Sequence, residues 1–414
     1  MNMLYKIITI ILLLFVVEVQ AQTELADYLI IGAENNPGLK AKFSEYNAAL
    51  EKVPQVGTLP DPQLTFGYFI SPIETRVGPQ RAKFGMNQMF PWFGTLHAKE
   101  DVVIQMAKAK YEAFEEAKSK LFFEIKSAFY NVYFIQKGID ITKENIRILN
   151  TFQQLAIIKI ETGKASVVDE MRVEMEINEL ENQLAYLMDS KYAIEVKFNN
   201  LLYRLDDSPV NIPNTLLNDS LLVSKNELLD SISTQNHLIK QLEYKILSWG
   251  NQEVVAKKMG MPQFSIGVDY ALIGKSNNPN LGSENGRDAL LLPKVGISVP
   301  LYRKKYTAMV REASFQMEAT EFRKVDKQNQ LSSLFEKGYK DYKDAERRIN
   351  LYQKQLKLAN KSMNILLTSY ATDGKDFEEV LRIERKVLKY SLEIDKARAD
   401  KNAAVAFINY LLGR

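Results

Sequence analysis

The sequence predicts a mainly α-helical protein with a transmembrane β-barrel part, built from two similar halves of one chain. Long stretches without proline repeat apolar residues at steps that sum to seven, which is the spacing of a coiled coil. Four shorter stretches alternate apolar with small or polar residues, as strands with two different faces do. The same order of elements occurs twice, and this internal repeat constrains the fold more than any single element does.

The first 21 residues have the layout of a cleavable secretory signal peptide. Lys6 precedes an apolar run from Ile7 to Val17, and Ala21 ends the segment. This run is shorter than the ~20 residues that a bilayer-spanning helix needs, and no other stretch approaches such a helix. The sequence therefore predicts an exported protein and argues against a polytopic inner-membrane protein.

Composition excludes several functions. The chain of 414 residues contains no cysteine, which excludes disulfides, thiol chemistry and a lipidated N-terminal cysteine. A net charge of +3 gives no electrostatic footprint for nucleic acid. The two histidines, His97 and His237, have no partners at ligand spacing, and there is no glycine-rich phosphate loop. We therefore expect no enzyme, no metal site and no cofactor.

The first repeat covers residues 22–206. Its predicted elements are a short helix over 25–52 that Asn36-Pro37 interrupts, strands at 63–71 and 82–91, and a helical hairpin at 95–205. In the first strand Leu64, Phe66 and Tyr68 fall on one face. Both arms of the hairpin carry an apolar stripe, and the stripe of the returning arm ends at Leu205. The arms are therefore expected to pack on each other or on neighbouring helices.

The turn of this hairpin is predicted from its own residues. Gly163 supplies the left-handed conformation that ends a helix, and Ser166 with Asp169 forms a capping box for the next helix. At ~1.5 Å of rise per residue the first arm would extend about 100 Å, which is too long for a small globular domain.

The second repeat covers residues 224–414 and follows a linker at 207–223 that is rich in Asp, Asn and Pro. Its predicted elements are a helix at 225–258, strands at 262–272 and 290–301, and a helical hairpin at 304–412. The apolar stripe of its long arm includes Phe315, Phe322 and Val325. Each repeat therefore contributes two strands and one helical hairpin.

Strands with an apolar outer face and a small or polar inner face are typical of outer-membrane barrels. Four strands cannot close a barrel, and an open edge in lipid would leave backbone groups unpaired. Other copies must then complete the barrel, and three copies would supply twelve strands, an even number within the range of such barrels. The alternative is a soluble four-stranded sheet capped by coiled coils, which would need a cover for its apolar face.

Two motifs and the duplicated hairpin resemble the TolC family of outer-membrane efflux ducts. The motifs are Leu59-Pro60-Asp61-Pro62-Gln63-Leu64 before the first strand and Phe90-Pro91-Trp92-Phe93-Gly94 after the second. The resemblance covers essentially all of the chain after the signal segment. It implies a homotrimer with a twelve-stranded barrel and a hollow helical cylinder, in the outer membrane of a Gram-negative bacterium and with a large periplasmic part. The 207–223 linker would then lie at the equator of the cylinder.

The resemblance also implies passive conduction. Ducts of this family carry substrates that an inner-membrane pump delivers through a periplasmic adaptor, and the strand exit favours ducts that serve RND-type pumps, heavy-metal pumps among them. Small molecules and metal ions both remain open as substrates. Two alternatives also remain, which are the outer-membrane channel of a type I protein secretion system and a structural coiled-coil protein of the periplasm.

Candidate functional residues follow from the same resemblance. The positions that match the family's periplasmic gate are Asp169, Arg172, Glu379 and Arg382. This sequence lacks a double acidic ring there, and capping of the helix N-termini by Asp169 and Glu379 is a compatible second role. The turns expected to form the periplasmic tip and to dock the adaptor contain Gly163, Lys164, Asp373, Gly374, Lys375 and Asp376.

Further candidates lie in the strands and at their ends. Asp269 and Lys294 are expected on the polar face, toward a water-filled lumen where charge is tolerated. Phe90, Trp92 and Tyr302 are expected to be aromatics at the membrane interface, or else ordinary packing residues at the strand ends.

Overall fold

The computed structural model describes residues 24–373 and 377–414, except residues 218 and 278. The predicted signal segment 1–21 and the tip residues Gly374, Lys375 and Asp376 lie outside the described residues. The chain divides into two compact units. The first, here called the helical unit, comprises Met1–Lys42, Phe114–His237 and Lys327–Arg414, and the second, the strand unit, comprises Phe43–Ala113 and Leu238–Asp326. Each unit takes segments from both predicted repeats, whose boundaries stay a prediction.

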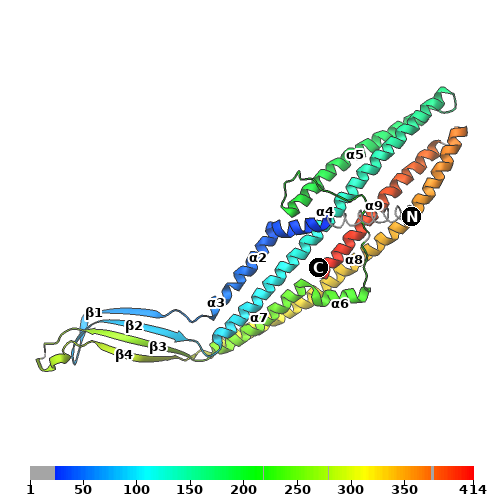
Figure 1. Ribbon diagram of the computed structural model, residues 1–414. Coiled ribbons are helices and arrows are strands. Elements are labelled where there is room, and N and C mark those ends of the chain that lie inside the picture. The colour runs from blue at the N-terminus through cyan, green and yellow to red at the C-terminus, as the bar shows by residue number, and fades with distance from the viewer. Residues whose placement is uncertain (1–23, 218, 278, 374–376) are drawn as a thin grey trace, which may run out of the picture. The chain divides into compact units, whose positions relative to one another are not determined.

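The strand unit contains one antiparallel sheet with the strand order β1-β2-β3-β4. Its strands are β1 (Gln63–Thr75), β2 (Gly78–Phe90), β3 (Gln263–Ile273) and β4 (Ala289–Ser298). The unit also holds α3 (Lys52–Gly57), most of α2 (Pro37–Leu50) and of α7 (His237–Met259), and the first parts of α4 and α8 (Figure 1). The central pairing joins β2 of the first repeat to β3 of the second, so both repeats build a single sheet.

The strand boundaries differ from the prediction in two places. The expected loop around residues 72–81 is mostly strand, because β1 shifts register after Tyr68 and pairs again from Ile73 to a tight turn before Gly78. Gly78 has a φ of +137°, which a side chain would strain, and its carbonyl accepts a bond from Thr75 Oγ1 at 2.6 Å. At the other end, β4 stops at Ser298 and not at 301, where Pro300 has no N–H for a ladder.

One face of the sheet is apolar and exposed. On β1 the side chains of Leu64, Phe66, Tyr68 and Ile70 are 64–91% exposed. Large apolar side chains on the other strands are also exposed to solvent, among them Phe84, Met86, Ile266, Tyr270, Leu290, Val295 and Ile297. Within the part of the chain that the structure describes, nothing covers this face. The opposite face carries small and polar residues, as the alternation predicts.

The helical unit contains two long hairpins. The first consists of most of α4 (Thr95–Glu161) and all of α5 (Val167–Leu202), and the second of most of α8 (Arg303–Asp373) and all of α9 (Phe377–Leu411). One of its core clusters joins α4 and α5 to the ends of α8 and α9 through Leu149, Phe152, Val173, Ile177, Leu180, Tyr370, Phe377, Val380 and Leu381. The heptad stripes therefore form a core that links the two hairpins.

Two features of the predicted helices are wrong. The helix expected at 225–258 is broken at Asn236, whose extended backbone separates α6 (Lys225–Gln235) from α7. The side-chain amide of Asn236 donates instead to the carbonyl of Leu411 at 2.8 Å. The α5 helix ends at Leu202, because Tyr203 takes a left-handed conformation with a φ of 55°. Leu205, expected in the apolar stripe, therefore lies outside the helix and is 78% exposed.

The predicted stripe on the first part of α8 is exposed in the single chain. Phe315, Phe322 and Val325 are 67%, 68% and 54% exposed, so this predicted seam has no partner among the described residues. A second stripe on the same helix, made of Leu351, Leu358 and Ile365 at seven-residue spacing, is also exposed. Both stripes have the spacing at which helices pack on one another, but within the described chain no helix covers either stripe.

No helix among the described residues has the length and apolar content needed to cross a bilayer. The described part of the chain also lacks any group of three or more histidine, cysteine, aspartate or glutamate side chains placed to hold a metal ion.

Candidate functional site

The first candidate site lies at the turn of the first hairpin and the helix ends packed near it, all within the helical unit. Gly163 has a φ of +70°, and a side chain there would meet no atom within 4 Å. The predicted capping box is present, since Ser166 Oγ accepts from Val168 N at 3.2 Å and Asp169 Oδ2 accepts from Ser166 N at 3.4 Å. Lys164 is exposed at the same turn. The turn therefore presents a small, open surface.

The four predicted gate residues form two ion pairs, each within one helix. Arg172 lies 3.4 Å from Asp169 on α5, and Arg382 contacts Glu379 on α9. Arg172 differs from Arg382 because its Nε also lies 3.4 Å from Glu378 Oε2, across from α5 to α9. Of the four, only Arg172 is thus linked to the other hairpin by an ion pair between described residues.

Three residues that sequence reasoning missed, Glu378, Arg385 and Glu176, complete this network. Arg385 on α9 lies 2.8 Å from Glu176 on α5 and 4.0 Å from Glu378. Arg172, Glu378, Arg385 and Glu176 therefore form a chain of alternating charge between the two return helices, here called the tip network. Glu378 and Arg385 are seven residues apart on α9, so their heptad spacing was the available signal.

A buried carboxyl group adjoins the tip network. Glu384 on α9 is only 3% exposed, and its Oε1 has no hydrogen-bond partner among the described residues. Burial raises the pKa of Glu384 from 4.5 to about 7, the negative charge of Glu176 adds to this, and Arg385 opposes it. This carboxyl group is therefore protonated in mildly acidic solution and becomes a buried anion above neutral pH.

Ionisation of Glu384 gives a pH prediction. Because the pKa of Glu384 is higher in the folded protein, its contribution to the free energy of unfolding is fully present below pH 4.5. This contribution falls between pH 4.5 and 7 and stays lost above pH 7. Glu384→Gln should remove this loss, which amounts to at most ~3 kcal/mol per chain. Thermal melting should show equal stability at pH 4.5 and a more stable variant at pH 8. The exposed Glu181→Gln is the control, and parallel melting curves for Glu384→Gln and the wild type would contradict the assignment.

A second link between the hairpins is made by Lys159, near the end of α4. This side chain is buried, and its ammonium donates to the backbone carbonyl of Tyr370 and to that of Ala371 at 3.1 Å, in the last turn of α8. The same ammonium lies 4.7 Å from the centre of the Tyr370 ring. Carbonyls at a helix C-terminus lack partners in their own helix, so a buried cation there stabilises the contact.

Asp169 also faces this link. Burial and the nearby Asp169 carboxylate raise the pKa of Tyr370. The Tyr370 ring is fully buried, and its centre lies 4.7 Å from the centre of the Phe377 ring. Asp169 therefore forms the capping box and also lies close enough to Tyr370 to affect the pKa of that side chain. Lys159 gave no sequence signal, because a lysine in the last turn of a helix is a common surface residue.

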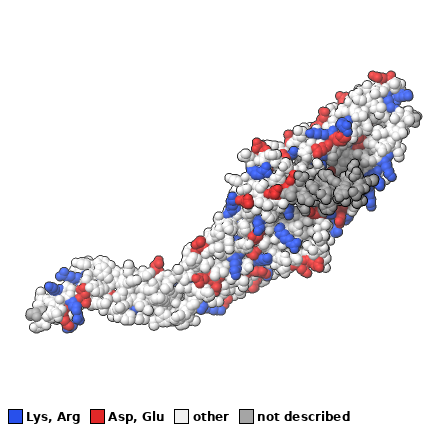
Figure 2. Space-filling view, viewed as in Figure 1, with Lys and Arg blue, Asp and Glu red and all other residues white. Residues whose placement is uncertain are grey.

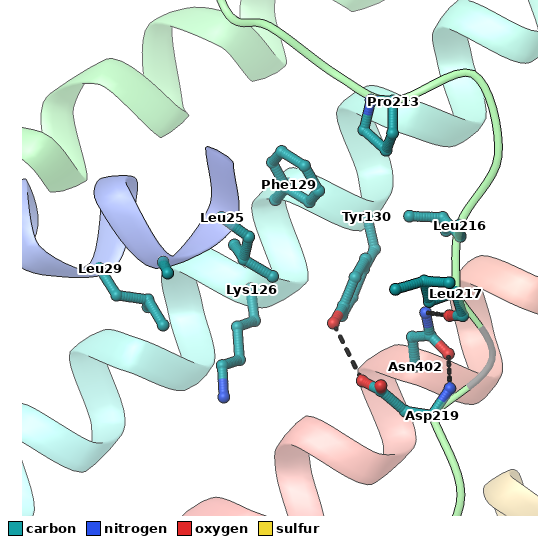
Figure 3. Close-up of a pocket in the computed structure, with 11 residues that line it drawn as sticks. Leu25, Leu29, Lys126, Phe129, Tyr130, Pro213, Leu216, Leu217, Asp219 and Asn402 are labelled. Carbon is teal, nitrogen blue, oxygen red and sulfur yellow. Dashed lines mark hydrogen bonds between the residues drawn. The ribbon is translucent and has the colours of Figure 1, made fainter. Parts of the chain in front are cut away.

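The 207–223 linker is held to the helical unit at a cavity of about 280 Å³ (Figure 3). Asn402 of α9 accepts from Asp219 N at 3.1 Å and donates to Leu217 O at 2.7 Å, while Tyr130 of α4 donates to Asp219. Lys126 and Asp219 point toward the same hollow, where burial lowers the pKa of Lys126 and raises that of Asp219. These contacts fix the linker, whose described residues form no helix or strand.

The second candidate site is the polar face of the sheet in the strand unit. Asp269, expected there with Lys294, lies 3.2 Å from the Lys294 ammonium. Lys83 on β2, which sequence reasoning missed, lies 3.0 Å from the same carboxylate. Lys83 escaped notice because the alternation in β2 is less regular than in β3 and β4.

Aromatic side chains gather where the strands end. Trp92 stacks on Phe264 with 5.9 Å between the ring centres, and Phe93 packs beside both rings. Phe90 pairs with Phe264 in the ladder, and Tyr302 beyond β4 is 84% exposed. Phe93 and Phe264 thus join the three aromatics expected from the sequence. Figure 2 shows an uncharged surface over the sheet, with charged residues at its loop end.

A sheet with one exposed apolar face, together with long paired helical hairpins, is also found in solved structures of outer-membrane channels. The Vibrio cholerae outer membrane protein VceC is similar with a TM-score of 0.76 and 13% identity, over 95% of this chain and 97% of that chain. For CusC, described for its transmembrane channel formation, the TM-score is 0.77 and the identity 15%, over 94% and 92%.

The open-state MtrE channel of Neisseria gonorrhoeae is similar over 94% of this chain and 89% of its own, with a TM-score of 0.73 and 13% identity. No family model matches the sequence, and the comparison with curated proteins finds no match. The chain therefore has the fold of these outer-membrane channels, which confirms the predicted mainly α-helical fold with a small antiparallel sheet, while the barrel completed by three copies stays a prediction.

Proposed function

We propose that this protein is an outer-membrane channel that assembles as a homotrimer and conducts solutes passively out of the periplasm. The observation that carries the proposal is the sheet. Its exposed apolar face suits lipid, and β1 and β4 each have one edge without a ladder partner in the described chain. Three copies joined edge to edge would close a twelve-stranded barrel with its apolar face outward.

The exposed stripes on α8 support assembly of the helices as well. Phe315 and Phe322, with Leu351, Leu358 and Ile365, have coiled-coil spacing but lack a partner within the described residues. Neighbouring copies would cover them, so the exposed stripes favour an oligomer. The helices would then form the wall of a periplasmic duct, with the anchored linker at its equator.

The turn at Gly163 and the helix ends at Asp373 and Phe377 would form the periplasmic tip, where an adaptor protein from a pump complex would dock. The open surface around Gly163 and Lys164 suits such docking. An RND-type pump in the inner membrane is the partner that the fold resemblance favours, with small molecules or metal ions as substrates. The tip network and Lys159 would hold the hairpins together in the closed duct.

The tip network predicts different roles for two similar arginines. Arg172→Gln removes an ion pair between the return helices, whereas Arg382→Gln removes one within a single helix. Because these pairs are partly exposed, Arg172→Gln should raise the leak of the closed duct only about two- to five-fold. Antibiotic sensitivity of cells and single-channel conductance measure this leak. Equal effects of the two variants would contradict the role given to Arg172.

Reconstitution tests the function itself. The purified protein, extracted with detergent, should have the mass of a trimer and give discrete current steps in planar bilayers. A water-soluble monomer or dimer without conductance would overturn the proposal and would support a structural coiled-coil protein.

A further inference from the structure

The polar face of the sheet carries a compact charge group made of Lys83 on β2, Asp269 on β3 and Lys294 on β4, here called the lysine–aspartate group. The lysine ammonium groups lie 3.0 Å and 3.2 Å from the two oxygens of the single carboxylate. The Asp269 side chain is 9% exposed, whereas each lysine side chain is 46% exposed. The anion is therefore covered, and the two cations face the open side of the sheet.

Each of the three charged residues has a glycine as a ladder partner, and one of these glycines makes room for the carboxylate. Lys83 pairs with Gly67, Asp269 with Gly85, and Lys294 with Gly267 in the ladders. A Cβ atom at Gly85 would lie 2.8 Å from Asp269 Oδ1, so any other residue would push the carboxylate away. The backbone at Gly85 thus leaves space for the Asp269 carboxylate, and the group is built into the sheet.

The group has a net charge of +1, which the strands do not cancel. The charged residues of the four strands are Glu74, Arg81, Lys83, Asp269 and Lys294, which makes three cations and two anions. Glu74 and Arg81 lie near the tight turn of the first hairpin, away from the group. Along the middle of the strands the polar face is therefore positive.

We propose that the lysine–aspartate group makes the channel prefer anionic solutes. This inference rests on the proposed function, because only a closed barrel turns the polar face into the wall of a lumen. Each copy would then add one net positive charge to a ring, and rings of lysine or arginine favour anions in pores. Such a ring acts over ~30 Å at 0.01 M salt but only ~3 Å at 1 M, so the preference should fade as salt rises.

Reversal potentials in planar bilayers under a dilute KCl gradient test this inference. The wild type should pass chloride more readily than potassium. Lys83→Gln with Lys294→Gln leaves Asp269 alone, and the permeability ratio of chloride to potassium should fall below unity. Asp269→Asn leaves two cations, and the ratio should rise by about two-fold. Lys83→Arg with Lys294→Arg keeps the charge and is the matched control, with an unchanged ratio.

The outcomes separate the two proposals. A wild-type protein without channels would overturn the proposed function. Channels that prefer potassium, or a ratio that none of these substitutions changes, would overturn the anion preference while the channel proposal stands. Where the double glutamine variant fails to form trimers, the single Lys83→Gln and Lys294→Gln variants replace it, and each should bring the ratio close to unity.

Discussion

Val295→Lys should abolish stable trimers in the outer-membrane fraction. Val295 lies on the apolar face of β4 and is 66% exposed in the single chain, so the proposed barrel turns it toward lipid. A lysine on the lipid face near the bilayer midplane costs about 2–4 kcal/mol, and a trimer would carry that cost in every copy. Membrane fractionation and the heat resistance of the trimer band measure the effect.

The matched control is Thr65→Lys, which places the same charge on the polar face of β1. Water in the lumen would solvate this lysine, as it would the native Lys83 and Lys294, so trimers should persist. The opposite ranking, or two variants that assemble equally well, would contradict the assignment of the apolar face to lipid.

Lys159→Met should open the closed tip more than any substitution in the tip network. The variant removes a buried ammonium and leaves the carbonyls of Tyr370 and Ala371 without their donor. Each hydrogen bond from a charged donor is worth ~1.5–3 kcal/mol, and the cation–π contact adds up to ~2 kcal/mol when it is desolvated. The α4 and α8 ends should separate more easily, with higher single-channel conductance and greater sensitivity of cells to large antibiotics.

Lys143→Met provides the control for this variant, because Lys143 is exposed on the same helix and should leave the leak unchanged. Circular dichroism should report the same helical content for both proteins. A Lys159→Met channel with wild-type conductance would show that the link between α4 and α8 does not limit opening.

Most of the fold could be predicted because its signals are local or periodic. Period-two alternation marked β1, β3 and β4, heptad stripes marked the long helices, and Gly163 with Ser166 marked a turn whose cap is present. Errors arose where tertiary contacts override local pattern. Ile73 pairs beyond Pro72 and lengthens β1, and Asn236 breaks a helix to reach Leu411.

The candidate sites were less predictable, because their partners are distant in the sequence. Lys159 binds main-chain carbonyls of another helix, and no residue type marks such a partner. Glu384 has the side chain of an ordinary surface residue, and only its packing makes it titrate near neutrality. The stripe at Phe315 was recognised by its spacing, but spacing alone does not tell whether the partner belongs to the same chain.

The order of strands in the sheet has a consequence for folding. Phe90 at the end of β2 pairs with Phe264 at the start of β3, and the whole first helical hairpin is made between them. During synthesis β1 and β2 can therefore form only an isolated two-stranded ribbon until β3 has been made. Such a ribbon is marginally stable in water and exposes apolar side chains. Pairings this distant in sequence close slowly. The nascent chain should need a chaperone that keeps it unaggregated until β3 has been synthesised. The full-length chain should need such a chaperone until it assembles with its other copies.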